Sequence, residues 1–303
     1  LPAHHAGLFY VQEPSACSAV TVLDPQPGEK VLGLCAAPGG KSTQIAGLLE
    51  GKGLLWANEI VKSRAQILLS NGERLGVRNA VVSSCHPQRL CECLQGFFDR
   101  VLVDAPCSGE GMFRRDPEAI AQWSPESPAA CAQRQRAILD SASLAVREGG
   151  VLVYSTCTFS REENEDNVRW FLDAHPEFQL VPLYLSFGRP GLDGLPVCRI
   201  FPMDGGEGHF VAKFQRVGEN SCKAGTFTAY LPRREEPEIQ ALFEELFTCP
   251  WPGQATRFGD RVLLLPQDLP ELSGLGVLRA GVELCRQKGK RWEPSHAVFH
   301  AAR

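Results

Sequence analysis

Short apolar runs rich in β-branched residues alternate with longer amphipathic stretches from about residue 20 to residue 215. This alternation is typical of α/β domains, in which helices cover both faces of a mostly parallel sheet. Strands are expected over residues 30–36, 53–58, 79–83, 100–103, 151–154, 178–182 and 210–214. Helices are expected over residues 42–49, 62–75, 133–147 and 162–172. The pattern therefore predicts a doubly wound, mostly parallel, Rossmann-like α/β sheet.

A second and smaller unit is expected after this sheet. The stretch Val217–Thr226 contains glycine, serine and lysine and is predicted to be a linker. Beyond it, a short amphipathic helix is expected over 237–247, and β-rich structure over 261–265 and 276–285. A chain of 303 residues can hold one large domain and one small module. We predict a main domain over 1–217 and a small α+β module over 226–303.

Two cysteines follow two of the apolar runs at the same relative place. Cys107 comes after Val101–Val103 in Asp104-Ala105-Pro106-Cys107, and Cys157 comes after Val151–Val153 in Tyr154-Ser155-Thr156-Cys157. In α/β sheets, ligands bind at the carboxyl ends of the strands. Most cysteines are small buried hydrophobes, but a proline before one and polar neighbours around the other argue against that interpretation here. The pattern favours a functional pair, with one attacking thiol and one helper.

The first turn between a predicted strand and a predicted helix is rich in glycine. Gly33–Ser42 would bring backbone and a helix N-terminus close to a ligand. It lacks the first glycine of a P-loop, because Cys35 occupies that place, and it also fails the dinucleotide fingerprint. Glu59 follows Gly40 by nineteen residues, a spacing that suits a carboxylate binding ribose hydroxyls. A tight turn followed by a surface acid remains the alternative.

Composition limits the classes of partner. The net charge of −4 does not favour general attraction to nucleic acid, so an RNA partner would need local basic patches. The candidates are Arg114 with Arg115, Arg134 with Arg136, and the run 286–291, although basic runs are often only solvated faces. No run approaches the ~18 apolar residues that span a membrane, and no signal-type leader is seen. We expect a cytoplasmic monomer without membrane contact.

The twelve cysteines do not predict a disulfide scaffold or a metal site. Their density in 303 residues is low for a stapled secreted domain, so reduced thiols are expected. Cys91 and Cys93 lie near His86, but a second pair of ligands at zinc-finger spacing is missing. We predict no bound metal.

Three long motifs carry a resemblance to a known family. Residues 34–42 (LCAAPGGKS), 104–111 (DAPCSGEG) and 154–158 (YSTCT) resemble the RNA cytosine-5 methyltransferases of the Nop/Sun class. The segments 13–16 (EPSA), 162–165 (EENE), 206–210 (GEGHF) and 291–297 (RWEPSHA) narrow the resemblance to the bacterial 16S ribosomal RNA branch, the RsmF (YebU) type. The resemblance covers nearly the whole chain. It implies a substrate of RNA, either 16S ribosomal RNA or the 30S subunit.

The resemblance also implies a cofactor and its contacts. S-adenosylmethionine would be held by the loop residues Cys35, Ala36, Ala37, Pro38, Gly39, Gly40 and Lys41. Glu59 would bind the ribose hydroxyls, and Asp104 would lie near both cofactor and base. The class usually has an acidic residue after the third strand to meet the adenine amine, but residues 83–87 read SSCHP here. Backbone groups or a water molecule would have to recognise adenine instead.

The mechanism implied by the resemblance gives the two cysteines different roles. Cys157 would attack carbon 6 of cytosine, and Cys107 would assist release by removing the proton from carbon 5. Asp104, protonated or through a shared proton, would offset charge at ring nitrogen N3 or contact the amine. Contacts with RNA are expected from Arg114, Arg115, Lys288, Lys290 and Arg291.

Three alternatives to this function remain. A DNA cytosine-5 methyltransferase would use the Pro-Cys cysteine, Cys107, as the nucleophile and would not need Cys157. A non-catalytic RNA-binding or ribosome-assembly factor could keep the fold, and a transfer RNA could be the substrate of the same chemistry. Members of the class usually carry further RNA-binding domains. Because the chain opens at Leu1, we expect it to lack most of the N-terminal one and to bind RNA weakly by itself.

Overall fold

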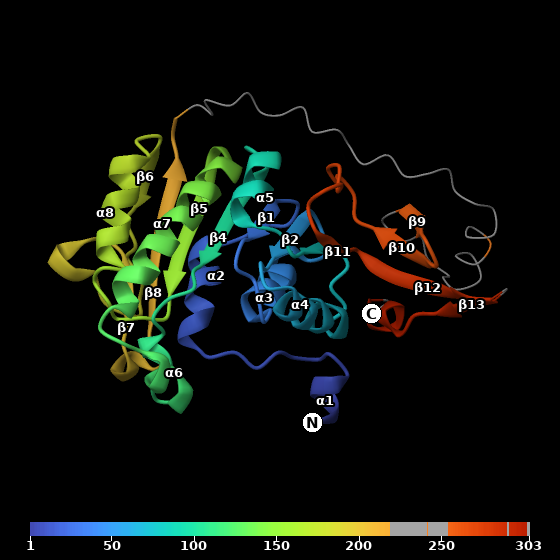
Figure 1. Cartoon of the computed structure of the whole chain (residues 1–303), viewed down its shortest axis with the longest axis horizontal. Coiled ribbons are helices and arrows are strands. Elements are labelled where there is room, and N and C mark those ends of the chain that lie inside the picture. Colours follow the sequence, from blue (N-terminus) through green and yellow to red (C-terminus); the bar gives the residue numbers. More distant parts are fainter. Residues whose placement is uncertain (219–240, 242–253, 290, 302–303) are drawn as a thin grey trace.

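A large mixed sheet forms the centre of the computed structural model (Figure 1). The structure describes residues 1–218, 241, 254–289 and 291–301. The strand order is β11-β3-β2-β1-β4-β5-β8-β6, with β7 beside β8. The bounds are β1 (Lys30–Gly33), β2 (Leu54–Asn58), β3 (Ala80–Ser83), β4 (Phe98–Asp104), β5 (Val146–Thr156), β6 (Phe178–Val181), β7 (Cys198–Ile200), β8 (His209–Arg216) and β11 (Val277–Ala280). Strands β1 to β5 run parallel to one another, whereas β8 runs antiparallel to β5 and β11 runs antiparallel to β3.

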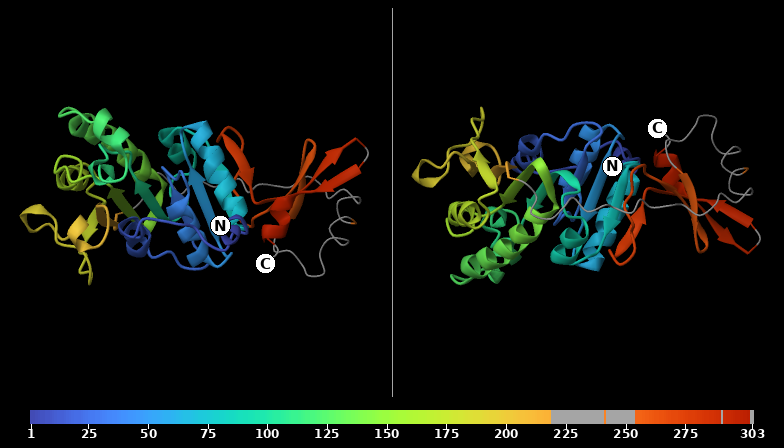
Figure 2. Two further views of the ribbon diagram at one scale, coloured as in Figure 1. Left: turned by 90° about the horizontal axis from the view of Figure 1, so that it is seen from below. Right: turned by 90° about the horizontal axis from the view of Figure 1, so that it is seen from above.

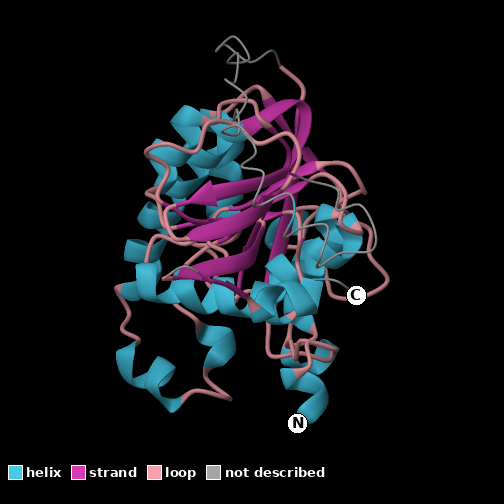
Figure 3. Ribbon diagram, turned by 90° about the vertical axis from the view of Figure 1, so that its right-hand side faces the viewer, coloured by secondary structure: helices cyan, strands magenta, loops and turns pink. Residues whose placement is uncertain are grey.

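Helices cover both faces of this sheet (Figure 3). Their bounds are α1 (Pro2–His5), α2 (Ser18–Leu23), α3 (Gly40–Leu49), α4 (Lys62–Arg74), α5 (Pro87–Cys93), α6 (Pro117–Gln122), α7 (Ser127–Ala145), α8 (Glu165–Ala174) and α10 (His296–Ala301). Short 3-10 turns are η1 (Ser15–Cys17), η2 (Glu110–Met112), η3 (Leu192–Gly194) and η4 (Pro202–Asp204). The predicted doubly wound α/β fold is confirmed.

The two faces bury alternate residues of each strand, as the period of two requires. On one face Trp56, Val101 and Tyr154 pack in the same apolar cluster as residues of α7 and α8. On the other face Leu102 and Val153 join the cluster formed with α2 and α3. Because both faces are covered, the strands are apolar at almost every position, which explains the continuous apolar runs in the sequence.

The C-terminal region forms a second, antiparallel sheet of order β13-β12-β10-β9. Its strands are β9 (Gln254–Phe258), β10 (Arg261–Leu265), β12 (Val282–Lys288) and β13 (Arg291–Pro294). This sheet and α10 share an apolar cluster that includes Val262, Leu284 and Val298. Figure 2 shows it beside the β3 edge of the large sheet, joined to it through β11.

Several elements differ from those expected. The sequence predicts one β-rich stretch over 276–285 in the small module, but Gly281 divides it, and β11 pairs with β3 of the large sheet instead. Gly281 adopts φ +68, and a side chain there would collide with the Leu264 carbonyl. The third expected helix begins at Ser127 rather than at 133, and α2, α5 and β7 were not predicted.

Part of the predicted organisation falls outside the described residues. The expected linker 217–226 is described only at 217 and 218, and the expected helix 237–247 only at 241. The division into 1–217 and 226–303 therefore stays a prediction. Among the described helices, none is long and apolar enough to cross a membrane.

Candidate active site

The loop between β1 and α3 is shaped by two glycines. Gly39 has φ +121, a conformation that side chains rarely adopt, and it precedes the first residue of α3. A side chain at Gly40 would collide with Gln12 of the lead-in segment. The loop Cys35–Lys41 thus needs glycine at both positions, and its backbone lies at the N-terminus of a helix, where anionic or polar ligands are favoured.

Asn58 ties the ends of three strands together, which sequence reasoning missed. Its amide nitrogen donates to the carbonyls of Leu34 (3.3 Å) and Cys85 (3.0 Å), and its oxygen accepts from Ser83 Oγ (2.8 Å). The side chain is fully buried. This single amide therefore fixes the place of the next residue, Glu59, relative to the loop that follows β1.

Glu59 lies at the end of β2, where the sequence predicts a ribose-binding acid. The residue is only 3% exposed, and its carboxylate accepts from the Val61 amide at 3.1 Å and lies 3.4 Å from the Arg64 guanidinium. It is therefore not a solvated surface acid. Past the end of β3, His86 Nδ1 accepts from the Gln88 amide and caps α5.

A cavity of about 630 Å³ connects these groups with the two cysteines. We call it the cysteine cavity; its walls include Glu59, His86, Asp104, Cys107 and Cys157. A smaller cavity of about 290 Å³ lies where the loop Cys35–Lys41 meets the lead-in segment, and Asp104 lines both. The structure therefore brings the predicted cofactor loop, the ribose acid and both cysteines to one edge of the sheet.

The Sγ atoms of Cys107 and Cys157 lie 3.3 Å apart. Either thiol can donate to the other; with Cys107 as the donor, the hydrogen bond lowers the pKa of Cys157 although burial opposes the shift. The same hydrogen bond, reinforced by burial, raises the pKa of Cys107 well above its usual range. The positive charge of Lys41 also favours the thiolate of Cys157. The pair is thus unequal: Cys157 is the sulfur that ionises first.

Asp104 is held as a carboxylate. Burial would raise its pKa, but the charge of Lys41 acts together with smaller contributions, among them the hydrogen bonds from Lys41 and Ser155, and the pKa is lowered. Lys41 Nζ lies 2.7 Å from Oδ2, and Ser155 Oγ donates to Oδ1 at 2.9 Å. The side chain is still 30% exposed, so it can reach a ligand. The Asp104 carboxyl is therefore ionised, whereas the sequence also allowed a protonated Asp104.

His209, at the start of β8, is a neighbour that sequence reasoning missed. It is 4% exposed, and its Nε2 lies 3.8 Å from Asp104 Oδ1 without a hydrogen-bond partner among the described residues. Burial, assisted by the charge of Lys41, lowers the pKa of His209 to about 4, so its ring is neutral at pH 7. The only sequence signal was its place in the segment 206–210 (GEGHF).

A buried acid fixes the loop that carries Cys107. The Glu163 carboxylate accepts from the backbone amide of Ser108 (3.0 Å), the Ser108 hydroxyl (2.5 Å) and Gln135 (2.7 Å). Gly111 approaches from the same loop and donates to the Cys157 carbonyl at 2.8 Å, where a side chain would be too close. The two cysteine-bearing loops are therefore tied to each other by backbone as well as by sulfur.

Cys35, the cysteine of the loop Cys35–Lys41, is not part of the reactive pair. Burial raises the pKa of Cys35 to about 12, so it stays a thiol and forms part of the cavity wall. Within the described residues, no three His, Cys, Asp or Glu side chains are grouped so that they could hold a metal ion.

The predicted RNA contacts do not converge on one surface. Arg115 and Arg114 lie 2.9 and 3.7 Å from the carboxylate of Glu207, next to the Cys107 loop. Lys288 pairs with Glu293 at 2.7 Å in the small sheet, where Arg291 begins β13. Lys290 lies outside the described residues. Figure 1 shows α6, which follows the arginines, and β13 at opposite ends of the molecule.

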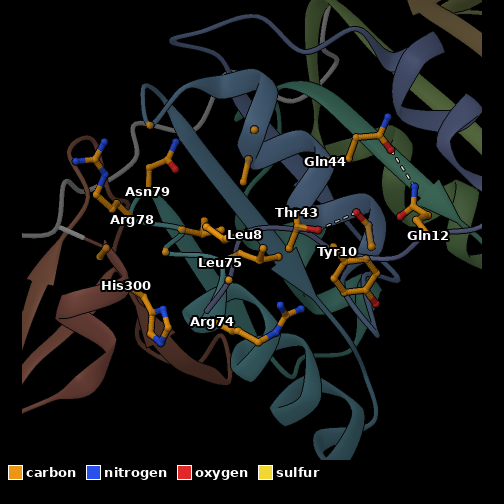
Figure 4. Close-up of a pocket in the computed structure, with 18 of the residues that line it drawn as sticks. Leu8, Tyr10, Gln12, Thr43, Gln44, Arg74, Leu75, Arg78, Asn79 and His300 are labelled. Carbon is orange, nitrogen blue, oxygen red and sulfur yellow. Dashed lines mark hydrogen bonds between the residues drawn. The ribbon is translucent and has the colours of Figure 1, made fainter. Parts of the chain in front are cut away.

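A third cavity, of about 520 Å³, lies away from the cysteines between the lead-in segment, α3, the end of α4 and α10 (Figure 4). Its prominent cation, Arg74, donates to the backbone carbonyls of His4 and Phe9 and so anchors the lead-in segment. Cys107, Cys157 and Asp104 do not line it. We therefore assign the chemistry to the cysteine cavity.

Two protein-family models match the chain. Residues 20–215 match the family model described as 16S rRNA methyltransferase RsmB/F, and residues 242–301 match the RsmF rRNA methyltransferase first C-terminal domain. A ribosomal RNA small subunit methyltransferase F from Klebsiella pneumoniae is 37% identical over 317 residues, and one from Escherichia fergusonii is 41% identical over 319. Each alignment covers 99% of this chain and 66% of the relative, so the chain spans slightly less than two thirds of their length.

Two solved structures share the fold at substantial sequence identity. NSun6 from Pyrococcus horikoshii, solved with SFG, is 35% identical with a TM-score of 0.65, over 72% of this chain and 56% of that one. A methyltransferase homologue from the same organism is 33% identical with a TM-score of 0.61, over 71% of this chain and 70% of that one.

Proposed function

Because the chain belongs to the 16S rRNA methyltransferase RsmB/F family, we propose that it methylates carbon 5 of a cytosine in 16S ribosomal RNA. The reaction proceeds through a covalent bond between Cys157 and carbon 6. The observation that carries this proposal is the pair of sulfurs 3.3 Å apart at one cavity, with the pKa of Cys157 lowered. The chain acts as a monomer in the cytoplasm, where ribosomal RNA is found.

S-adenosylmethionine supplies the methyl group when it is bound. The residues present fit it: the loop Cys35–Lys41 lines a cavity beside a helix N-terminus, and the Glu59 carboxylate lines the cysteine cavity. Cys35–Lys41 would contact its methionine and ribose, and Glu59 would accept from the ribose hydroxyls. The end of β3 offers no acid for adenine. The adenine amine would therefore be recognised by backbone groups or by His86, which lines the same cavity.

Cys157 begins the reaction as a nucleophile. Carbon 5 of cytosine is too weak a nucleophile to take a methyl group directly, and addition of a thiolate at carbon 6 makes it an enamine carbon. Charge then develops at N3, where the Lys41–Asp104 pair can provide a proton or a hydrogen bond. The base must leave any stack to reach the sulfur.

Cys107 ends the reaction as a base. When Cys157 bonds to carbon 6, Cys107 loses the anionic partner to which its thiol donates. It must then release its own proton to the solvent to become a thiolate, which removes the proton from carbon 5. The electron pair of that C–H bond restores the ring double bond and expels Cys157 as a thiolate. The proton at N3 returns to the Lys41–Asp104 pair, so this pair ends the reaction in its starting protonation state.

Replacement of Cys107 provides the direct test. Cys107→Ala should accumulate a covalent protein–RNA adduct in the presence of S-adenosylmethionine, visible as a shifted band on a denaturing gel, whereas Cys157→Ala should form none. The reaction is run near pH 8.5, about the pKa of a free thiol, because Cys157 loses its stabilising donor in the variant. The opposite result would assign attack to Cys107, as in a DNA-type enzyme.

Two further measurements distinguish this function from a non-catalytic assembly factor and from a transfer RNA methyltransferase. Absence of heat in calorimetric titration with S-adenosylmethionine would favour the assembly factor. Bisulfite mapping of 16S and transfer RNA from cells with and without the gene identifies the substrate. Loss of a 5-methylcytosine from transfer RNA alone would overturn the assignment to 16S RNA.

A further inference from the structure

One cation of the cysteine cavity has no role in the chemistry described so far. Arg134 projects from α7 and lines this cavity together with Cys107 and Cys157. The residue is exposed, and among the described residues its guanidinium makes neither an ion pair nor a hydrogen bond. Arg136, two residues further on, donates to Asn167 at 2.8 Å and lies 5.3 Å from the Trp170 ring centroid. Only the first of the two arginines is therefore available to a ligand.

The two carboxylates of the cavity wall already have cationic partners. Glu59 lies beside Arg64 at 3.4 Å, and Asp104 pairs with Lys41 outside the cavity wall at 2.7 Å. Arg134 thus adds a positive charge without a matching carboxylate among these wall residues. A cavity with such a charge attracts an anion more than a cation.

The two ligands of the proposed reaction differ in sign. S-adenosylmethionine carries a sulfonium and an ammonium against one carboxylate, so a free arginine gives its overall charge no attraction. A cytidine drawn out of its stack brings the phosphates on either side of it to the mouth of the cavity. A guanidinium fits phosphate oxygens with two parallel hydrogen bonds.

We propose that Arg134 binds a backbone phosphate next to the target cytidine. The inference rests on the proposed function, because it takes RNA as the substrate of the cysteine cavity. The contact positions the nucleotide and carries no sequence information, because phosphates are the same along the strand.

The test compares Arg134→Gln with Arg147→Gln in the complete chain. Arg147 pairs with Asp99 at 2.5 Å and does not line the cavity, so its variant removes the same charge elsewhere. Binding of transcribed 16S RNA is measured at several salt concentrations. Arg134→Gln should weaken it about tenfold, and the slope of log K against log salt should fall by about 0.7, the value for one phosphate on a single strand. Arg147→Gln should change neither by more than about twofold.

Calorimetry with S-adenosylhomocysteine provides the second measurement. Its affinity should be the same in Arg134→Gln and in the unmodified chain. A weaker affinity for this ligand together with an unchanged salt slope would assign Arg134 to the cofactor and overturn the proposal. An unchanged RNA affinity and slope would overturn it as well, and would leave Arg134 as a solvated side chain.

The adduct keeps this proposal separate from the proposed function. In the Cys107→Ala background, Arg134→Gln should still form the adduct at saturating RNA but need about tenfold more RNA for half-maximal yield. If Cys107→Ala by itself forms no adduct, this result contradicts the proposed covalent mechanism and not the phosphate contact of Arg134.

Discussion

A sulfur atom attacks carbon only as a thiolate, so the environment of Cys157 matters more than its identity. Two neighbours favour its anion: the thiol of Cys107 donates to it, and Lys41 contributes positive charge. Asp104 and burial oppose ionisation. The balance depends on Cys107 remaining a thiol until attack, so in the proposed mechanism the residue that ends the reaction also prepares its start.

Alkylation as a function of pH tests this dependence. In the unmodified chain, Cys157 should react with iodoacetamide at a lower pH than a free thiol does, because its pKa is lowered. Cys107→Ala removes the donor, so the midpoint should move to higher pH, and Cys107→Ser, which keeps a donor, should lie between. Peptide mass spectrometry follows each cysteine, with Cys35 as an internal control that stays unlabelled. An unmoved midpoint in Cys107→Ala would contradict the hydrogen bond.

The positions of the candidate site residues were easier to predict than those of the residues that support them. Cys107, Cys157, Asp104 and Glu59 lie at or just after strand ends, a position that hydrophobic patterns reveal. Asn58 and His209 act through contacts with strands far away in the chain, and a single polar residue in an apolar run does not indicate its partner. Unpaired buried polar groups are costly, so such residues are understood only when the tertiary contacts are known.

At the scale of elements, the turn between β5 and α8 organises the site. Glu163 holds the Cys107 loop, Asn164 Oδ1 accepts from Thr156 Oγ1 at 2.6 Å, and Glu165 forms an ion pair with Arg199 of β7. Three successive side chains therefore connect this turn to β5 itself, to the loop after β4, and to β7. In the sequence, the segment 162–165 was noticed only as part of a resemblance. Its side chains contact three separate parts of the fold, and such contacts leave no periodic pattern in the sequence.

Breaking the Glu165–Arg199 pair should lower stability strongly. Both side chains are buried, at 0% and 4% exposed, with Arg199 Nη2 2.5 Å from Glu165 Oε2. Arg199→Met leaves a buried carboxylate without its partner and should lower the free energy of unfolding by about 3–5 kcal/mol. Urea denaturation measures the change, and Glu165→Leu in addition should recover most of it.

Arg189→Met is the matched control for that prediction. Arg189 pairs with Asp204 at 3.1 Å but is 53% exposed, so its loss should lower stability far less than the loss of Arg199. Equal losses in the two single variants would contradict the importance of burial.

Most strands and helices of the large sheet follow from periodicity, and the exceptions have local causes. The first strand was predicted to reach residue 36 but ends at Gly33, because the chain turns there toward the ligand edge. The helix over 127–145 begins at Ser127-Pro128, and proline is favoured in the first helical turn. α2 and β7 are six and three residues long, too short for a periodic signal.

At the scale of the whole molecule, the C-terminal region completes the large sheet. β11 pairs with β3, and Arg279 from this strand forms ion pairs with Glu73 of α4 and with Glu283 of β12. This arrangement could not be predicted from the sequence, since nothing in residues 277–280 indicates which edge they would pair with. The strand leaves β3 without a free edge.

Gly276 offers a test of how much this pairing contributes. It has φ +60, its carbonyl accepts from the Ser84 amide at 2.9 Å, and a side chain there would collide with the Ser84 carbonyl. Gly276→Ala should lower the free energy of unfolding by about 1 kcal/mol for the backbone conformation and by a further ~1–3 kcal/mol for the clash. Gly289→Ala, at φ +61 with open space around it, should show only the first cost. Similar thermal shifts in both variants would mean that the junction contributes little.

The pairing of β3 with β11 has a consequence for synthesis on the ribosome. The chain is made from its N-terminus, and β11 begins 197 residues after β3 begins, since 277 − 80 = 197. At ~5–20 residues per second, the edge of β3 waits about 10–40 seconds for its partner. An unpaired edge can recruit strands from other chains during that interval. The rate of translation through residues 84–276 should therefore affect the yield of folded protein more than its final stability.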